Sequence, residues 1–248
     1  ENEETYDYLN QYVDFGVTES KSVTFKGKEY PTYTYGGYTY VPSPIISSSI
    51  KDDSFGSIPA REFSQEILGS FVYSYTRIAK PIDHSTDREN GEWEDCNENL
   101  ETTAPFIAGV YQCTISNNDA TYGSLIGTTT VTYVIQPKIA TFYIQEASSD
   151  YGDPFAEITA QDTNGDLCIG DEGQATSMGN FSIGEVASSP EVAAAEDTLL
   201  YAGTYDITGT DNAPNYYIEY VKNTYTVTPR PITVTPTNKT SVYGDEVV

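Results

Sequence analysis

The residues best suited by type and spacing to bind an ion lie in one short acidic run, Asp162-Thr-Asn164-Gly-Asp166. Carboxylate and amide oxygens at alternate positions of a tight turn are ligands that Ca²⁺ prefers. An EF-hand loop would have Gly at its sixth position and Glu at its twelfth, but this chain has Leu167 and Gly173 there. The run therefore predicts either a plain Asn-Gly turn or a weak calcium site formed by Asp162, Asn164 and Asp166. We expect no other cofactor.

A second acidic run surrounds the only tryptophan. Glu92, Glu94 and Asp95 flank Trp93, and paired carboxylates are what a glycosidase uses as its acid and its nucleophile. The same run is also typical of a solvated turn, and residues 80–104 read as a long irregular connection. A tryptophan ring can stack against a sugar without any catalysis. Trp93 is therefore a candidate glycan-binding residue.

Nucleophilic catalysis has little support in the sequence. The only histidine, His84, lies in a polar stretch, and no serine stands in a nucleophile-elbow motif. Three cysteines (Cys96, Cys113 and Cys168) are too few and too scattered for a disulfide scaffold or a zinc site. A single disulfide between the nearest pair, Cys96 and Cys113, is left open. We predict that the chain has no catalytic residues and is not an enzyme.

Tyrosine is abundant, with 22 residues in the chain, and it alternates with small residues over residues 33–40 around Gly36-Gly37. This pattern predicts a β-hairpin. Alternating tyrosines usually pack across strands. Exposed tyrosines beside a glycine turn also give a large contact area at low entropic cost. Tyr38 and Tyr40 are therefore candidate ligand-binding residues, with strand packing as the alternative.

The charge balance restricts the partners. The chain has 12 Lys and Arg against 37 Asp and Glu, a net charge of −25, and no Lys or Arg occurs between positions 139 and 221. So negative a surface repels phosphate backbones and anionic membranes, so we expect no nucleic-acid partner. No apolar run approaches the length needed to span a bilayer, so we also expect no membrane insertion.

One stretch of the sequence occurs twice, at residues 133–153 and 225–245. Each copy opens on Tyr-x-x-x-Pro and ends on Tyr-Gly-Asp, and the offset of 92 positions (225 − 133 = 92) holds without a gap. Upstream of each copy, residues 108–115 and 202–207 share the pattern Ala-Gly-x-Tyr. Internal repeats of this kind indicate a chain built from similar structural units.

Alternating apolar residues and turn signals predict mostly β structure, and the repeat divides the chain into four segments. Ser189-Pro-Glu191 is typical of a helix start, so we expect one short helix near 190–200 and a second near 60–68. Ile232 and Val234 alternate with threonines, which predicts a strand that pairs either with the second unit or with a sheet edge of another chain. The segments are residues 1–21 (tail of a preceding module or docked arm), 22–137 (divergent N-terminal β module), 138–229 (repeat module) and 230–248 (start of a truncated third repeat).

Several short motifs follow one another in residues 138–229: Tyr151-Gly152-Asp153-Pro154, Asn164-Gly165-Asp166-Leu167, Ala202–Ile207, Asn215-Tyr216 and Tyr225–Pro229. In this order they resemble the MBG repeat, YGX type, which is found in tandem on bacterial cell-surface proteins. Residues 22–137 resemble a related surface repeat less closely, through Phe25–Glu29, Gly69–Tyr75 and Pro105–Tyr111.

The resemblance implies tandem β-grasp-like modules with one short helix each, and an immunoglobulin-like β-sandwich is the alternative architecture. It also implies a non-catalytic, extracellular stalk or adhesin segment at a bacterial cell surface, with neighbouring repeats of the same chain as partners. The alternative function is a glycan- or host-protein-binding module that acts through the divergent unit at 22–137.

Overall fold

The computed structural model of the chain describes ten stretches: residues 13–16, 21–46, 49–52, 56–59, 71–82, 89–117, 127–184, 200–211, 213–240 and 242–244. In these stretches the regular structure consists of strands β1 to β17, with no helix. The predicted mostly-β class is therefore confirmed. The helices expected near 60–68 and 190–200 fall almost entirely outside the described residues, and His84 lies outside them as well.

The first unit is built on a six-stranded sheet with the order β2-β3-β10-β9-β7-β8. β3 and β10 are parallel, and the other neighbours are antiparallel. Two short antiparallel ladders form separate sheets: β1 (Val13–Gly16) with β4 (Ser43–Ile46), and β5 (Ser49–Asp52) with β6 (Gly56–Pro59). The strands of the large sheet are β2 (Ser22–Phe25), β3 (Lys28–Thr34), β7 (Val72–Pro81), β8 (Trp93–Glu101), β9 (Gly109–Asn117) and β10 (Gly127–Gln136).

Both faces of this sheet carry buried residues in the central strands. Successive residues of a strand point to opposite faces, so Tyr111 and Cys113 pack with Tyr133 in the large core. Their neighbours Val110 and Val134 belong to a smaller core on the other face. Near-continuous apolar stretches in the central strands follow from this two-sided burial.

The two edges of the six-stranded sheet approach each other. Lys26, just after β2, pairs with Asp95 of β8 at 2.7 Å, and the backbone N–H of Thr24 lies 3.4 Å from Asn90 Oδ1, just before β8. Because β2 and β8 are the outermost strands, these contacts require the sheet to curl around the smaller core. The curl follows from the right-handed twist that strands accumulate across a sheet.

The acidic run around Trp93 is a strand, not part of an irregular connection. The expectation for residues 80–104 was wrong, because residues 93–101 form the edge strand β8, which pairs with β7. Glu94 pairs with Lys80 of β7 at 3.1 Å. An edge strand exposes unpaired backbone groups, and charged side chains there discourage pairing with other chains. This is why a strand can carry a composition typical of a solvated turn.

The hairpin predicted within residues 33–40 does not form. β3 ends at Thr34, and both of its edges are occupied by β2 and β10, so no place is left for a returning strand. Gly37 has φ +75°, which favours glycine, and the chain turns away from the sheet there. Tyr40 N–H then donates to the carbonyl of Pro105 at 2.9 Å.

The second unit combines two sheets, with the orders β13-β11-β16 and β12-β17-β15-β14. β11 is parallel to β16, and β12 is parallel to β17. Ile144, Ile207 and Tyr225 are buried in a core of this unit alone, whereas Phe142 and Ile218 belong to the large core that includes the first unit. The strands are β11 (Lys138–Ile144), β12 (Ala147–Asp150), β13 (Ala160–Gln161), β14 (Gly179–Ile183), β15 (Gly203–Asp211), β16 (Tyr216–Val221) and β17 (Thr224–Thr228).

The sequence repeat has a structural counterpart. The order β12-β17-β15-β14 reproduces β3-β10-β9-β7, with the parallel pair at the same place. Tyr205 lies opposite Tyr225 as Tyr111 lies opposite Tyr133. In both units the first tyrosine donates its hydroxyl to the carbonyl four residues earlier, at 2.9 Å for Tyr111 and 2.7 Å for Tyr205.

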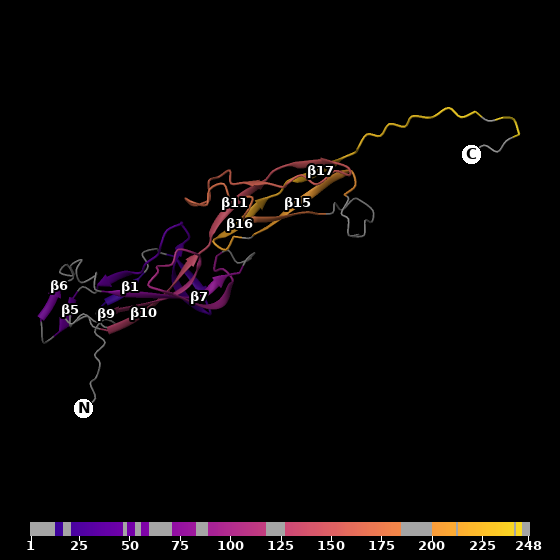
Figure 1. Cartoon of the computed structure of the whole chain (residues 1–248). Helices are drawn as coiled ribbons and strands as arrows, with labels where there is room; N and C mark the ends of the chain where they lie inside the picture. The colour runs from indigo at the N-terminus through magenta and orange to yellow at the C-terminus, as the bar shows by residue number, and fades with distance from the viewer. Residues whose placement is uncertain are drawn as a thin grey trace.

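Residues 229–240 contain no strand, which corrects the expectation for Ile232 and Val234. Their side chains are 83% and 80% exposed. The yellow trace in Figure 1 leaves β17 and runs away from both units. A single strand is not stable in water without a ladder partner, and the second unit does not provide one here.

Candidate functional site

The two units join without a linker. β10 ends at Gln136, Pro137 follows, and β11 begins at Lys138. Proline fixes φ and cannot donate a hydrogen bond, so it stiffens the connection and ends the ladder. The N–H of Lys138 donates at once to the carbonyl of Asn215, at 3.0 Å. In Figure 1 the units lie end to end, with the β10–β11 connection between them.

A partly buried carboxylate, Asp171, accepts hydrogen bonds from one tyrosine of each unit across this joint. The Tyr35 hydroxyl donates to Asp171 Oδ2 at 3.1 Å, and the Tyr216 hydroxyl donates to the same oxygen at 2.7 Å. The two rings meet edge to face with centroids 5.3 Å apart. Such pairs add stability beyond the area they bury.

The chemistry of this contact keeps both tyrosines protonated. Burial raises the pKa of Tyr35 to about 12, and the nearby charge of Asp171 adds to the rise. Burial is also the main cause that raises the pKa of Tyr216, followed by hydrogen bonding. Both hydroxyls therefore act as donors near neutral pH, and Asp171 is held as their shared acceptor.

Backbone groups complete the joint. The N–H of Ala108 donates to Asn215 Oδ1 at 2.9 Å, and the N–H of Cys168 donates to the Tyr216 hydroxyl at 2.9 Å. A Cβ placed on Gly37 would lie 3.3 Å from Cys168 Cβ, so glycine permits this close approach. Polar groups at the joint thus find specific hydrogen-bond partners, some of them across the two units.

One hydrophobic core continues through the joint. It contains Tyr33 and Tyr35 from the first unit, and Leu167, Cys168 and Tyr216 from the second. Bending at Pro137 would expose these side chains to water, at about 25 cal/mol for each Å² of apolar surface. The joint is therefore packed like a protein interior. The predicted boundary between the two units, near residue 137, remains a prediction. Because the two units share one core, each unit alone would expose part of that core to water.

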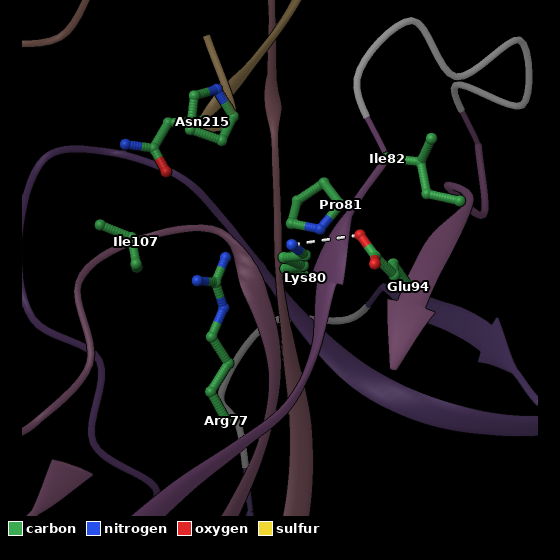
Figure 2. Close-up of a pocket in the computed structure, with 8 residues that line it drawn as sticks. Arg77, Lys80, Pro81, Ile82, Glu94, Ile107 and Asn215 are labelled. Carbon is green, nitrogen blue, oxygen red and sulfur yellow. Dashed lines mark ion pairs between the residues drawn. The ribbon is translucent and has the colours of Figure 1, made fainter. Parts of the chain in front are cut away.

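A pocket of about 480 Å³ opens beside the joint (Figure 2). Arg77 is buried in its wall, donates to the Ala108 carbonyl at 2.5 Å and approaches Glu98 at 3.4 Å. Lys80 pairs with Glu94 at 3.1 Å, as the dashed line in Figure 2 marks. A polar ligand would compete with Glu94 for Lys80. The lining residues are Arg77, Lys80, Pro81, Ile82, Glu94, Ile107, Pro214 and Asn215.

The structure brings Tyr38 and Tyr40 together, with ring centroids 4.6 Å apart, but it does not bring Trp93 to them. Tyr38 is 56% exposed, whereas Tyr40 is 2% exposed and donates its hydroxyl to the Thr34 carbonyl at 2.5 Å. Trp93 packs against the smaller core, on the other face of the sheet, and its Nε1 donates to the Asn90 carbonyl at 2.9 Å. Tyr40 therefore fills the core, and Tyr38 alone presents most of its surface to solvent.

The candidate calcium loop is closed by its own hydrogen bonds. The two carboxylate oxygens of Asp162 accept from the N–H groups of Asp166 and Leu167, each at 2.9 Å. Asp166 Oδ2 accepts from the N–H of Thr141 at 2.9 Å and lies 3.5 Å from Asn164 Nδ2. Asp162 thus closes the loop by accepting from the N–H groups four and five residues later. Among the described residues, no group of three or more His, Cys, Asp or Glu is arranged to hold a metal.

The cysteines are unpaired. Cys96 lies on β8 and Cys113 on β9, and β7 runs between these two strands. Strands two places apart are separated by roughly 9.5 Å, which is too far for a disulfide. Burial raises the pKa of Cys113 to about 12, so this thiol stays protonated and unreactive at neutral pH.

Comparison with known proteins adds no assignment. No protein family with a known sequence pattern matches this chain, and no curated protein is similar to it. Within the described residues, no helix has the length and apolar character needed to cross a membrane.

Sequence reasoning did not single out Tyr35, Asp171 or Arg77. Tyr35-Gly36 is a further copy of the Tyr-Gly pair that ends each sequence repeat, and this signal could have identified Tyr35. Asn215 and Tyr216 were part of the motif order that carries the family resemblance. Nothing in their local pattern indicated a contact with the first unit.

Proposed function

We propose that this chain is a non-catalytic extracellular repeat segment of a bacterial surface protein and acts as a stalk or adhesin segment. The joint carries this proposal. β10 continues into β11 through Pro137, and the two units share one core and the Tyr35–Asp171–Tyr216 contact. A stalk holds a distant part of the protein away from the surface, which requires units that do not bend at their junctions.

The charge supports the same role. A net charge of −25 keeps neighbouring molecules apart and soluble at high density on a surface. The acidic edge strand β8 acts in the same sense, because charged edges discourage sheet-to-sheet association. The partners proposed for this segment are therefore neighbouring repeats of its own chain.

For the architecture, we propose β-grasp-like units over immunoglobulin-like sandwiches. The parallel pairs β3–β10 and β12–β17 support this choice, because immunoglobulin sandwiches are built from antiparallel sheets. The short helix of the second unit would lie near 190–200. A backbone NMR assignment of these residues tests it: helical chemical shifts are expected, and extended ones contradict the proposal.

The stalk function is tested by measuring how rigid the joint is. Spin labels at Val72→Cys in the first unit and Val221→Cys in the second, in a Cys96→Ser background, place probes on two exposed positions. We expect a single narrow distribution of distances between the two labels, measured by double electron–electron resonance spectroscopy. The control inserts a Gly-Ser linker after Pro137 and should broaden the distribution. An equally broad distribution in the original chain contradicts the stalk function.

A second candidate function is binding of a glycan or a host protein through the first unit. The observation that favours it is the pocket of about 480 Å³ between Arg77, Lys80 and Asn215. A glycan array probed with the whole chain tests this function. Binding should weaken in Lys80→Ala and persist in Lys239→Ala, a matched removal of one lysine far along the tail. Binding that is equal in both variants, or absent altogether, counts against the pocket.

A further inference from the structure

The distal end of the second unit repeats the surface that the first unit uses in the joint. The N–H of Tyr35 donates to the carbonyl of Gln136 at 2.8 Å, and the N–H of Tyr151 donates to the carbonyl of Thr228 at 2.8 Å. Gln136 and Thr228 are the last residues of β10 and β17. Tyr151 therefore occupies in the second unit the position of Tyr35 in the first.

Two further features of the joint recur beside Tyr151. Gly152 follows Tyr151 as Gly36 follows Tyr35. Ala202 precedes the first residue of β15, as Ala108 precedes the first residue of β9. The backbone N–H of Ala108 is one of the groups that bind the second unit. The distal end thus presents the same ring and the same backbone edge.

The two surfaces differ in what covers them. Tyr35 is 5% exposed, whereas Tyr151 is 38% exposed and stacks only loosely on Tyr201, with ring centroids 6.3 Å apart. Ala108 is buried, and Ala202 is exposed. A shallow cavity of about 300 Å³ lies next to Tyr151, lined by Asp150, Gly152, Phe155 and Leu200 among others. The distal face is therefore open and partly apolar, with Asp150 and Asp153 among its lining residues.

We propose that this distal face docks a β module of the same kind as residues 138–229. Such a module would present a carboxylate at the place of Asp171 and a tyrosine at the place of Tyr216, and both would converge on Tyr151. Residues 230–245 repeat residues 138–153 directly after Pro229, so the first strand of the docked module lies within this chain. The inference rests on the proposed function to the extent that neighbouring repeats are the partners.

The start of the tail lies beside Tyr151. Arg230, the first residue after Pro229, forms an ion pair with Asp153, two residues beyond Tyr151. Ile232 and Val234 stand at the positions of Ala140 and Phe142, which are buried in the core shared by both units. Both tail side chains are exposed. Docking would bury them together with Tyr151.

The test is an extended chain in which residues 1–245 are followed by a copy of residues 154–229, which completes the repeat in register. Hydrogen exchange read by mass spectrometry is the measurement. We expect amide exchange at residues 151–153 and 230–236 to slow by roughly tenfold or more relative to the original chain. Replacing Asp171 by Ala in the appended copy alone should remove most of this protection, because Tyr151 loses its acceptor.

A matched control inserts a Gly-Ser linker after Pro229 of the extended chain. In this control the appended copy should fold, and exchange at residues 151–153 should stay as fast as in the original chain. That result would show that the protection in the direct chain comes from docking. Unchanged exchange at Tyr151 in the direct extended chain overturns the proposal. An appended copy that folds in neither chain also overturns it, because residues 230–245 would then not open a module. The spin-label distances across Pro137 are independent of this outcome, so failure here leaves the stalk function to its own test.

Discussion

Tyr35 and Tyr151 make the same backbone hydrogen bond at the same register of equivalent sheets, yet only Tyr35 is part of a core. At the joint, the second unit covers Tyr35 with Tyr216 and gives its hydroxyl an acceptor in Asp171. At the distal end, the Tyr151 ring stacks on Tyr201 and is 38% exposed. The local structure of the repeat is therefore the same at both ends, and the neighbouring unit decides whether the tyrosine contributes to stability.

The largest contrast is expected from truncating the two tyrosines. Tyr35→Ala should lower the free energy of unfolding by about 3–5 kcal/mol, because it removes a buried aromatic side chain and its hydrogen bond. Tyr151→Ala should lower it by less than about 1 kcal/mol, as is usual for an exposed position. Urea unfolding followed by the fluorescence of Trp93 measures both. Equal losses would show that the two ends do not differ in the way described.

The second contrast concerns the polar contacts of the joint. Asn215→Ala leaves the buried N–H of Ala108 without its side-chain acceptor, which should cost about 1–3 kcal/mol. Asn215→Asp keeps an acceptor oxygen at that place and serves as the control. The amide of Ala108 should exchange faster in the alanine variant, and unchanged exchange there would contradict the role of Asn215.

A smaller effect is expected from pH. The pKa of Tyr35 is raised from 10.0 to about 12 in the folded chain. The stability that the protonated hydroxyl contributes is therefore complete below pH 10 and is lost as the pH rises toward 12. The Tyr35→Phe variant lacks this hydroxyl. Its free energy of unfolding near pH 8 should therefore be about 1 kcal/mol lower than that of the original chain.

The other buried tyrosines titrate in both proteins. Their contribution to the pH dependence of stability therefore cancels when the original chain is compared with Tyr35→Phe. Thermal unfolding of the two chains between pH 8 and pH 12 is the measurement. The advantage of the original chain should shrink across this range. An advantage that stays constant would mean that the contact with Asp171 does not stabilise the joint.

The smallest effect is expected from calcium. The loop that contains Asp162 and Asp166 leads into Cys168 and Asp171 of the joint, and its carboxylates accept backbone N–H groups. We expect Ca²⁺ and Mg²⁺ to raise the melting temperature equally, by screening the negative charge. Asp166→Ala should respond in the same way. A saturable rise specific to Ca²⁺ that Asp166→Ala abolishes would instead establish a calcium site.

The sequence by itself determined the elements whose pattern is local. Alternating apolar residues predicted strands at 108–115 and 225–227, and these segments form β9 and part of β17. The 92-residue repeat reflects sheets with the same strand order. These features depend on the period of side chains along a strand and on proline at strand ends, and both can be read from neighbouring residues.

Only the tertiary structure decided which of these residues meet. Tyr38 and Tyr40 are two positions apart, yet one is exposed and the other is buried, because the chain forms no hairpin here and the Tyr40 N–H donates to the Pro105 carbonyl instead. The acidic run at 93–101 is a strand because β7 offers it an edge. Asp171 and Tyr35 are 136 positions apart, and no short-range pattern encodes a contact that exists only when two units share one core.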